Sequence, residues 1–411
     1  MEMRTVKLED ICLKVCSGGT PSSKIADYYN PPIIPWLTTS EVNYSYIYTT
    51  KKCISENGLN NSSAKLIPIN SVIVAMYGQG NTAGRVAINK IPLATNQACC
   101  NLIINPELAD YRFVYYVLSA KYNELVALKN GGAQPNLNAK KIREFEIPFP
   151  PRNIQGQIAV ILSSYDEMID NCKAQIALLE EAAQRLYREW FVDLRFPGHE
   201  TTPIGENGYP YDWHETKLGN ITSKFATGLN PRKNFVLGKG TNFYVTIKNL
   251  TQTYVVLDDK CDKIDDEALK KINRRSDLKA GDLLFSGIGT IGRVAFIFDT
   301  PTNWNISESL FTIRPNDLVS SEYLYLLLSD SGLQGYAHAN SQGSAQKGIR
   351  MAALKSYSFV LPSDKVLKKF NYVIKPYFKG LNTIHKMLNY YVETRSYLLP
   401  RLISGQIEIK E

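Results

Sequence analysis

The 411-residue sequence contains few of the patterns that bind metals or form disulfides. Its seven cysteines are odd in number and include no C-x-x-C pair, so they indicate neither a disulfide framework nor a zinc ribbon. Its four histidines show no ligand spacing; they are His199, His214, His338 and His385. We therefore expect reduced thiols and no bound metal.

Long apolar runs are also missing. No segment approaches the roughly 20 apolar residues that span a bilayer, and the first 16 residues carry charges where a signal peptide would be apolar. We expect a soluble, cytoplasmic protein with no membrane partner. The 47 Lys and Arg exceed the 39 Asp and Glu and leave a net charge of +8, which suits an acidic partner such as nucleic acid without requiring one.

Catalytic motifs are absent as well, because no Ser-His-Asp set, carboxylate pair or Walker loop is present. Residues 282–289 (DLLFSGIG) resemble the S-adenosylmethionine loop of cytosine-C5 methyltransferases, but a strand-like run follows where a helix is needed. Those enzymes also need a nucleophilic cysteine directly after a proline, and none of the seven cysteines follows a proline. Residues 30–33 (NPPI) resemble the Asn-Pro-Pro-aromatic loop of adenine-N6 methyltransferases, with Ile in the aromatic position. We therefore expect a hairpin turn at residues 282–289, a proline-rich turn at residues 30–33 and no cofactor bound by this chain.

A heptad pattern is present between residues 154 and 195. Apolar residues recur there in steps of four and three, interrupted at Gln175, at Ile154, Ile158, Ile161, Tyr165, Met168, Cys172, Leu179, Ala182 and Leu186. Charged residues fill most positions between them. So narrow an apolar seam predicts a long helix packed along another helix.

The same steps return from residue 364 to the end. They place Val366, Phe370, Val373, Tyr377, Leu381, Ile384, Leu388, Tyr391, Arg395, Leu398 and Leu402 on one face, with an interruption at Pro376 and Gly380. We expect two paired helices of roughly 35 residues, about 50 Å long. The proline and glycine should kink or locally unwind the second. An ordinary pair of amphipathic helices in a helical domain remains the simpler interpretation.

The two halves of the chain repeat one another about 210 residues apart. Ser17-Gly18-Gly19-Thr20-Pro21 answers Thr227-Gly228-Leu229-Asn230-Pro231, and Gly84-Arg85-Val86-Ala87 answers Gly292-Arg293-Val294-Ala295. Short β-rich runs separated by Gly, Asn and Pro precede one or two helices in each half. We predict an α+β fold with two similar globular α/β domains, two long antiparallel coiled-coil helices and an internal pseudo-two-fold. The expected boundaries are 1–153, helix 154–195, linker 196–215, 216–363 and helix 364–411.

These features together resemble the specificity (S) subunit of Type I restriction-modification systems over the whole chain. The most specific segments close the two helices, at 185–193 (RLYREWFVD) and 395–405 (RSYLLPRLISG). Residues 132–137 (GAQPNL), 147–151 (IPFPP) and 33–37 (IIPWL) are also similar to the family.

The resemblance implies a DNA-recognition subunit without catalysis of its own. Each globular domain would be a target-recognition domain that reads half of a bipartite double-stranded DNA site. The helices would set the half-site spacing and dock two modification (methyltransferase) subunits. S-adenosylmethionine, ATP and magnesium are expected only on partner modification and restriction subunits. A covalent pseudo-dimer fits this role because a two-fold repeat presents a DNA-reading surface twice.

We expect DNA contacts from polar and basic loop residues. In the first domain these are Lys24, Tyr77, Gln79, Arg85, Gln97, Gln134, Lys140, Lys141 and Arg143; in the second, Arg232, Lys233, Lys248, Ser286, Arg293, Gln346, Lys347 and Arg350. Since Arg85 and Arg293 lie in a motif that both copies keep, they are expected to hold phosphate or brace a turn rather than read bases. Spacer and docking contacts are expected from Ile161, Met168, Leu179, Leu186, Ile384, Leu388 and Leu398.

Two other functions compete with this interpretation. A stand-alone DNA methyltransferase or nuclease would bind S-adenosylmethionine by itself or cut DNA. A coiled-coil assembly protein would show no salt-sensitive DNA binding and no need for its globular domains.

Overall fold

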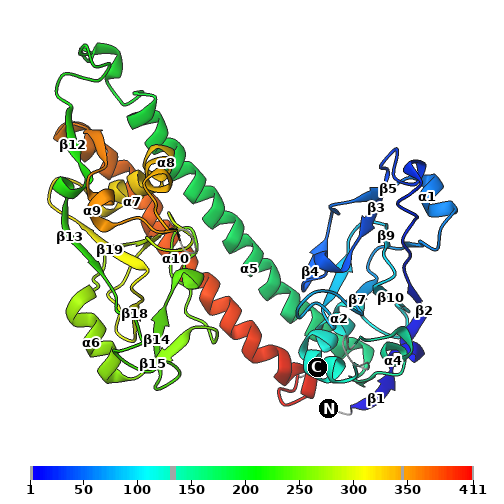
Figure 1. Cartoon of the computed structure of the whole chain (residues 1–411). Coiled ribbons are helices and arrows are strands. Elements are labelled where there is room, and N and C mark those ends of the chain that lie inside the picture. Colours follow the sequence, from blue (N-terminus) through cyan, green and yellow to red (C-terminus); the bar gives the residue numbers. More distant parts are fainter. Residues whose placement is uncertain (1–2, 130–135, 344–346, 410–411) are drawn as a thin grey trace. The chain divides into compact units, whose positions relative to one another are not determined.

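The computed structural model describes residues 3–129, 136–343 and 347–409. The chain forms two compact units (Figure 1): unit 1 contains Met1–Asn171 and Leu388–Glu411, and unit 2 contains Cys172–Met387. Each unit holds one globular domain and part of both long helices, α5 (Arg152–Tyr187) and α10 (Asp364–Ser404).

The globular domain of unit 1 contains two main sheets. The first has the order β2-β10-β7-β8-β4, with strands Cys12–Ser17, Cys99–Ile104, Val72–Ala75, Val86–Asn89 and Ser45–Ile47. The second has the order β5-β3-β9-β6, with strands Cys53–Ile54, Ile34–Leu37, Leu93–Thr95 and Leu66–Ile67. A separate antiparallel ladder pairs β1 (Arg4–Lys7) with β11 (Glu146–Phe149). The helices are α1 (Glu56–Asn60), α2 (Tyr111–Ala120), α3 (Tyr122–Ala127) and α4 (Ala139–Arg143).

The globular domain of unit 2 repeats this plan. One sheet has the order β13-β19-β16-β17, with strands Thr222–Thr227, Leu310–Pro315, Leu283–Ser286 and Val294–Phe296. The other has the order β15-β14-β18, with strands Asp262–Ile264, Asn242–Val245 and Trp304–Ile306. The ladder pairs β12 (His214–Lys217) with β20 (Ser358–Leu361). The helices are α6 (Asp266–Ser276), α7 (Ser321–Ser329), α8 (Ser331–Ala339) and α9 (Met351–Lys355).

The order of elements confirms the predicted duplication. Strands β2, β10, β7 and β8 neighbour one another in the same sequence as β13, β19, β16 and β17. Strand β3 pairs antiparallel with β5 and parallel with β9, and β14 does the same with β15 and β18. The loop after Asp282 is the turn between the antiparallel strands β16 and β17, so the hairpin interpretation is confirmed.

Helices α2 and α7 lie at the centre of their units. Phe113 to Leu118 of α2 and Tyr323 to Leu328 of α7 are buried without interruption. A helix that is apolar all round must be covered on every side. Each packs against the sheet of its domain and also reaches the long helix α5, through the Tyr116–Asp166 hydrogen bond in unit 1 and the Tyr187–Tyr323 ring contact in unit 2.

The apolar seam of α5 differs in part from the predicted one. Ile154, Ile158 and Cys172 are buried as predicted, but the steps then use Leu162, Ile169, Ile176 and Ala183. Met168, predicted to lie in the seam, is 43 % exposed, while Ile161, Leu179, Ala182 and Leu186 are half-buried. The assignment of Met168 to the buried seam was therefore wrong. The buried positions lie one residue after the predicted ones. Ile176 therefore occupies the seam next to Gln175, and the heptad has no interruption there.

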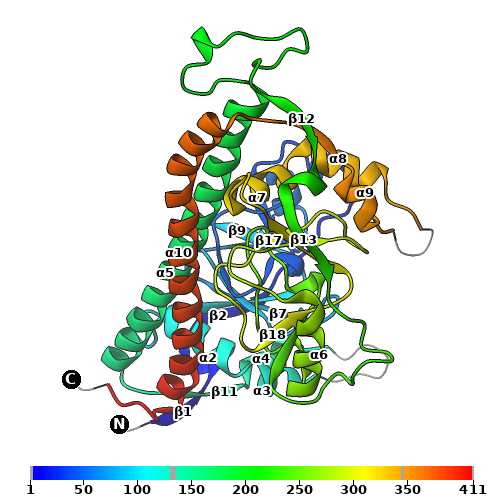
Figure 2. The ribbon, with the colours of Figure 1, turned by 90° about the vertical axis from the view of Figure 1, so that its left-hand side faces the viewer.

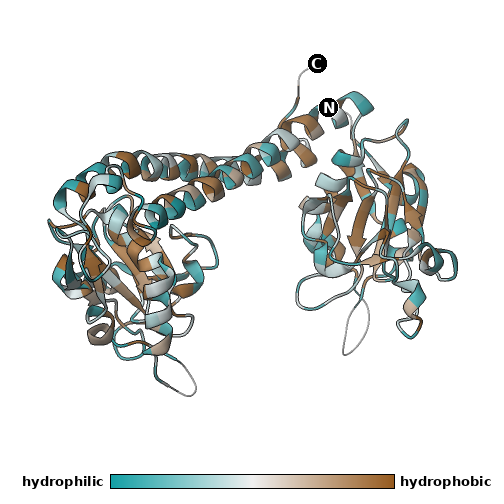
Figure 3. Ribbon diagram, turned by 90° about the horizontal axis from the view of Figure 1, so that it is seen from above, coloured by the Kyte–Doolittle hydropathy of each residue, from teal (hydrophilic) through white to brown (hydrophobic). Residues whose placement is uncertain are grey.

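Helix α10 runs antiparallel to α5 (Figure 2). In unit 1, Tyr165 contacts Tyr391 while Ile158 and Leu402 share a core cluster; in unit 2, Tyr187 contacts Phe370. Most predicted positions of the second seam are buried or half-buried, among them Leu381, Ile384, Leu388 and Leu398. Val373 is exposed, and Ile374 and Phe378 take its place in the core. Figure 3 shows the result as alternating apolar and polar residues along both helices.

The second helix continues through the predicted interruption. Residues 364–404 form one α-helix that includes Pro376 and Gly380, so the expected local unwinding was wrong. A proline inside a helix leaves the carbonyl four residues earlier without its amide. Here that residue is Tyr372, whose side chain is 85 % exposed, on a part of the helix that water reaches. Gly380 faces Leu179 of α5, at a position where an added Cβ would lie 3.4 Å from the leucine Cδ1.

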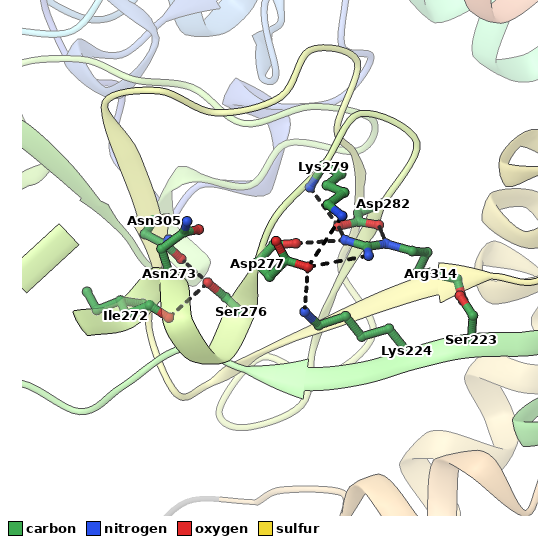
Figure 4. A network of polar contacts seen from close by, with 10 residues as sticks. All are labelled: Ser223, Lys224, Ile272, Asn273, Ser276, Asp277, Lys279, Asp282, Asn305 and Arg314. Atoms are coloured by element: carbon green, nitrogen blue, oxygen red, sulfur yellow. Dashed lines mark hydrogen bonds and ion pairs between the residues drawn. The ribbon is translucent and has the colours of Figure 1, made fainter. Parts of the chain in front are cut away.

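The first sheet of the unit 2 domain is fastened to α6 by a polar network (Figure 4). Arg314 on β19 forms a two-pronged contact with Asp282, at 2.6 and 2.9 Å, and donates to the backbone oxygen of Asp277 at the end of α6. Lys224 on β13 bonds the Asp277 carboxylate at 3.2 Å. The hydrogen bond to Asp282, which is fully buried, raises the pKa of Arg314. Strands β13 and β19, Asp282 before β16 and the end of α6 are thus held together.

The predicted linker, residues 196–215, is partly built into unit 2. Phe196 and Trp213 at its two ends are buried in the core cluster that also contains Tyr187 and Phe370. Between them lie a short 3₁₀ helix, His199–Thr201, and the bridge from Ile204 to Pro210.

Candidate nucleic-acid interface

A hollow of about 720 Å³ opens on the unit 2 domain, where loops following β13, β14 and β18 meet the β16–β17 turn. Arg232, Lys248 and Lys260 line it with exposed side chains. Glu308 and Tyr244 also line it, the tyrosine being 2 % exposed. Asp258 and Asp262 line it as well, so the hollow combines exposed groups of both charges with the partly buried carboxylate of Glu308.

The carboxylate of Glu308 is held by two donors. Asn230 Nδ2 donates to Oε1 at 2.6 Å, and the Tyr244 hydroxyl donates to Oε2 at 3.2 Å. The single proton of this hydroxyl is shared with the backbone oxygen of Leu229 at 2.7 Å, so Asn230 makes the stronger of the two contacts to the carboxylate. Burial, together with the nearby Glu308 charge, raises the pKa of Tyr244, which keeps it a neutral donor. These contacts fix the direction in which the carboxylate points.

The contacts among Asn230, Tyr244 and Glu308 form a polar frame. The unit 1 domain contains the same frame with different side chains. Thr20, which matches Asn230, donates its hydroxyl to Gln97, which matches Glu308. Trp36, which matches Tyr244, donates Nε1 to the backbone oxygen of Gly19 at 3.0 Å. Gly18 and its match Gly228 have no room for a Cβ, which would overlap the carbonyl oxygens of Thr95 and Ile306. The backbone is thus kept in both copies while the groups that it presents differ.

A capped turn borders the frame in both domains. The 3₁₀ helix Ile247–Asn249 begins where the Thr246 amide donates to Asn249 Oδ1, at 2.9 Å. Its match, Thr39–Glu41, begins where the Thr38 amide donates to Glu41 Oε1, at 3.2 Å. A side-chain acceptor at this place satisfies an amide that the turn leaves unpaired. Lys248 lies on the Ile247–Asn249 turn and lines the hollow.

The matched arginines Arg85 and Arg293 brace these turns. Arg293 Nη1 donates to the backbone oxygens of Ile247 and Leu250, at 3.1 and 3.3 Å. Arg85 Nη1 donates to Asn43 Oδ1 at 3.0 Å, just beyond the matching turn. The structure therefore supports the bracing role that was one of the two expectations for this pair.

Ser286 was predicted to contact DNA, but its side chain is used inside the protein instead. It is fully buried, its hydroxyl donates to the Thr290 oxygen at 2.6 Å, and it accepts the Arg293 amide at 2.8 Å. Its hydroxyl both donates and accepts a hydrogen bond within the protein, and these two bonds close the β16–β17 turn. Sequence alone gave no sign of this, since an exposed and a buried serine look identical.

The other predicted contacts are distributed over both domains. Exposed residues are Lys24, Gln79, Gln97, Lys140, Arg143, Arg232, Lys233, Lys248, Lys347 and Arg350, and half-buried ones are Tyr77 and Lys141. Gln134 and Gln346 lie outside the described residues. Lys347 approaches the hollow through its backbone oxygen, which accepts the Gly289 amide at 2.8 Å. Arg232 and Lys248 thus line the hollow, while Arg293 and Lys347 each hydrogen-bond a residue that lines it, Ile247 and Gly289.

The basic residues of α4 make other contacts. Arg143 donates to the Val15 oxygen on β2 at 2.9 Å, and Lys141 to the Leu128 oxygen at 2.5 Å. Lys140 lies 3.9 Å from Glu144 on the same helix. The structure does not link this group to the Thr20–Gln97 frame.

Sequence reasoning missed Glu308, Asn230 and Thr20. The usable signal was in the repeat itself, since these residues occupy matched positions at which the two copies differ within an otherwise similar pattern. Their side-chain hydrogen bonds, from Thr20 to Gln97 and from Asn230 to Glu308, then separate them from ordinary surface variation.

Comparison with known proteins identifies the family. The model of the Type I restriction modification DNA specificity domain matches residues 1–181 and again residues 210–394. The chain belongs to this family. Its two matches coincide with the two copies that the sequence and the element order define.

Specificity subunits are among the similar proteins. The chain is 27 % identical over 414 residues to the Type I restriction enzyme MjaIX specificity subunit of Methanocaldococcus jannaschii, covering 98 % of this chain and 93 % of that one. It is 28 % identical over 191 residues to the EcoR124I/EcoR124II specificity subunit of Escherichia coli, covering 45 % and 46 %. The crystal structure of the Type I S subunit from M. genitalium has the same fold, with a TM-score of 0.64 at 15 % identity, covering 100 % of this chain and 97 % of that one.

The described residues contain neither a membrane-spanning helix nor a group of metal-ligating side chains. None of the helices there has both the length and the apolar content needed to cross a membrane. No three His, Cys, Asp or Glu side chains in those ranges are grouped as metal ligands.

Proposed function

We propose that this chain is the DNA-reading subunit of a Type I restriction-modification enzyme and that each globular domain reads one half of a bipartite site. The observation that carries the proposal is the repeated frame. Two copies of one backbone arrangement present Thr20 and Gln97 in one domain and Asn230 and Glu308 in the other. A duplicated reader whose side chains differ suits a site with two unlike halves.

The proposed contacts divide by their chemistry. Exposed lysines and arginines around the hollow, such as Arg232 and Lys248, neutralise phosphates and position the duplex. The polar groups inside the frame face base edges, where sequence is read. Lys24, Gln79 and Lys347 remain proposed contacts on the neighbouring loops.

We further propose that the chain is not itself an enzyme. It would bind no cofactor; S-adenosylmethionine would act on two modification subunits, and ATP with magnesium on restriction subunits. The loop that resembles a methyltransferase cofactor site supports this proposal because it is a hairpin turn, closed by Ser286 and followed by strand β17.

Docking of two modification subunits is proposed for the long helices. Each helix leaves a large apolar side chain exposed at matched positions: Val160 on α5 with Tyr372 on α10, and Leu178 with Tyr390. Unit 1 thus carries Val160 and Tyr390, and unit 2 carries Tyr372 and Leu178. Exposed apolar side chains that recur in both copies favour a partner on each. Met168 belongs to this exposed set, whereas Leu388 acts inside the seam.

The test is sequencing of methylated bases in a host that carries the chain with its modification subunits. Adenine methylation at one bipartite sequence is expected, and none when either component is expressed alone. Methyl transfer or DNA cleavage by the purified chain would favour the stand-alone enzyme. Absence of salt-sensitive DNA binding would favour the coiled-coil assembly protein.

A further inference from the structure

The polar frames of the two domains differ in charge at one matched position, Glu308 in unit 2 and Gln97 in unit 1. Glu308 in unit 2 is a carboxylate, which only accepts hydrogen bonds, while its match Gln97 in unit 1 is an amide, which both donates and accepts. Both side chains follow the strand that pairs in parallel with the central strand, β18 or β9. The frame therefore offers different hydrogen-bonding chemistry from the same place in each domain.

Glu308 retains acceptor capacity after its internal contacts are counted. A carboxylate has about four acceptor positions, and Asn230 and Tyr244 use one on each oxygen. Both donors hold the carboxylate toward the hollow, which Arg232, Lys248 and Lys260 also line. A side chain aimed in this way can receive a further donor from a ligand whose phosphates those basic residues bind.

In the major groove only two bases present a donor: adenine through N6 and cytosine through N4. Guanine and thymine present acceptors at the corresponding places, which a carboxylate repels. We infer that Glu308 determines specificity in the half-site read by unit 2, by requiring an exocyclic amino group at one position and rejecting guanine and thymine there. This inference rests on the proposed function.

Asn230 and Tyr244 act as positioning residues in this scheme. The tyrosine is buried and its hydroxyl also reaches the Leu229 oxygen at 2.7 Å, so its place is fixed by the fold. Gln97 imposes no such requirement, because its amide carries both a donor and an acceptor where the carboxylate only accepts. The two half-sites should therefore differ in the strictness of this one position.

The test uses the full-length chain assembled with its modification subunits, and competition titrations against duplexes in which each base pair of the site is changed in turn. The wild-type complex is expected to prefer adenine or cytosine at one position of one half-site by about 5- to 150-fold. Glu308→Gln should remove most of that preference and leave the other half-site unchanged. The base-pair series itself decides between adenine and cytosine.

If Glu308→Gln does not fold, the reciprocal variant Gln97→Glu tests the same inference. It should create a preference for adenine or cytosine at a position of the half-site read by unit 1. Asp259→Asn, an exposed change near the hollow, controls for the loss of one negative charge.

Three results are informative. A wild-type complex without any sequence preference would contradict the proposed function itself. A selective wild-type complex whose preferences survive Glu308→Gln, or an equal gain in affinity for all duplexes as with Asp259→Asn, would overturn the inference alone. If only Gln97→Glu can be measured, its failure to create a preference would overturn the inference too.

Discussion

Arg395 on α10 forms an ion pair with Asp166 on α5 inside unit 1. The second carboxylate oxygen of Asp166 accepts the Tyr116 hydroxyl of α2 at 2.7 Å, so one carboxylate joins three helices. Burial, followed by the Asp166 charge, raises the pKa of Tyr116. The matched positions in unit 2 are apolar and buried: Leu326, Phe378 and Ala183. The two copies thus fill the same junction with a polar and an apolar set.

Arg395→Met should destabilise unit 1. It leaves Asp166 without its cation in a place where both side chains are only about one fifth exposed, and such a loss typically costs about 1–3 kcal/mol. The triple variant Tyr116→Leu, Asp166→Phe, Arg395→Ala copies the apolar set of unit 2 and should lie closer to wild type, because replacing a buried polar set completely is often nearly neutral. Urea denaturation followed by circular dichroism measures both. Equal stability of wild type and Arg395→Met would contradict this role.

Leu388→Asp should disrupt the helix pair, since Leu388 is 9 % exposed in the seam and a buried unpaired charge costs several kcal/mol, about half the stability of a typical domain. The matched control is Tyr390→Asp, two residues away and 62 % exposed. It should leave the thermal midpoint unchanged and weaken docking of one modification subunit. Thermal melts and mass measurement of the assembled complex separate these effects. A stable, fully assembled Leu388→Asp complex would rule out the seam.

Arg293→Ala should weaken binding to the specific duplex and to unrelated duplexes by the same factor, because the arginine braces the turn carrying Lys248. Arg293→Lys should behave similarly, since an ammonium does not reproduce the fork of a guanidinium. Competition titrations at several salt concentrations give the test. The slope of log affinity against log salt should become shallower by up to about one, because the displaced Lys248 loses a phosphate contact. Arg293→Lys should show the same change if bracing is the role, whereas it should keep the wild-type slope if residue 293 itself binds phosphate. A loss confined to the specific site would show base reading instead.

His385 should make the stability of unit 2 depend on pH. Burial lowers the pKa of this α10 residue, which packs on the Tyr254 ring, to about 4. An unfolded histidine titrates near 6.5. As pH falls from about 6.5 towards 4, the unfolded chain gains a proton that the folded chain resists, so stability is lost over that range. Above pH 7 the residue contributes no pH dependence.

The comparison variant is His385→Phe, which keeps a ring beside Tyr254 and cannot be protonated. The thermal midpoint of wild type should fall more than that of the variant between pH 7 and pH 5. The same change at the exposed His214 should leave the wild-type pH profile unaltered. Parallel profiles for wild type and His385→Phe would show that the buried histidine is not responsible.

The amino-acid sequence by itself determined the duplication, the α+β class, the two long helices and the hairpin at residues 282–296. These features depend on local spacing and on turn residues, which are written in neighbouring positions of the chain. The matched segments Gly84 to Ala87 and Gly292 to Ala295 are sufficient to show the repeat. Periodicity was equally sufficient for the existence and the approximate length of α5 and α10.

Tertiary structure alone decided which neighbouring residues face inward and which distant residues meet. Met168 and Ile169 both fit a heptad, and only the position of the partner helix makes the second the buried one. Ser286 has the composition of a surface polar residue in the sequence, but in the structure its hydroxyl makes two hydrogen bonds inside the β16–β17 turn. The contact of Asn230 with Glu308 joins residues 78 positions apart, and that of Asp166 with Arg395 joins two helices from opposite halves of the chain. Such pairs depend on the packing of whole elements, to which local spacing contributes no information.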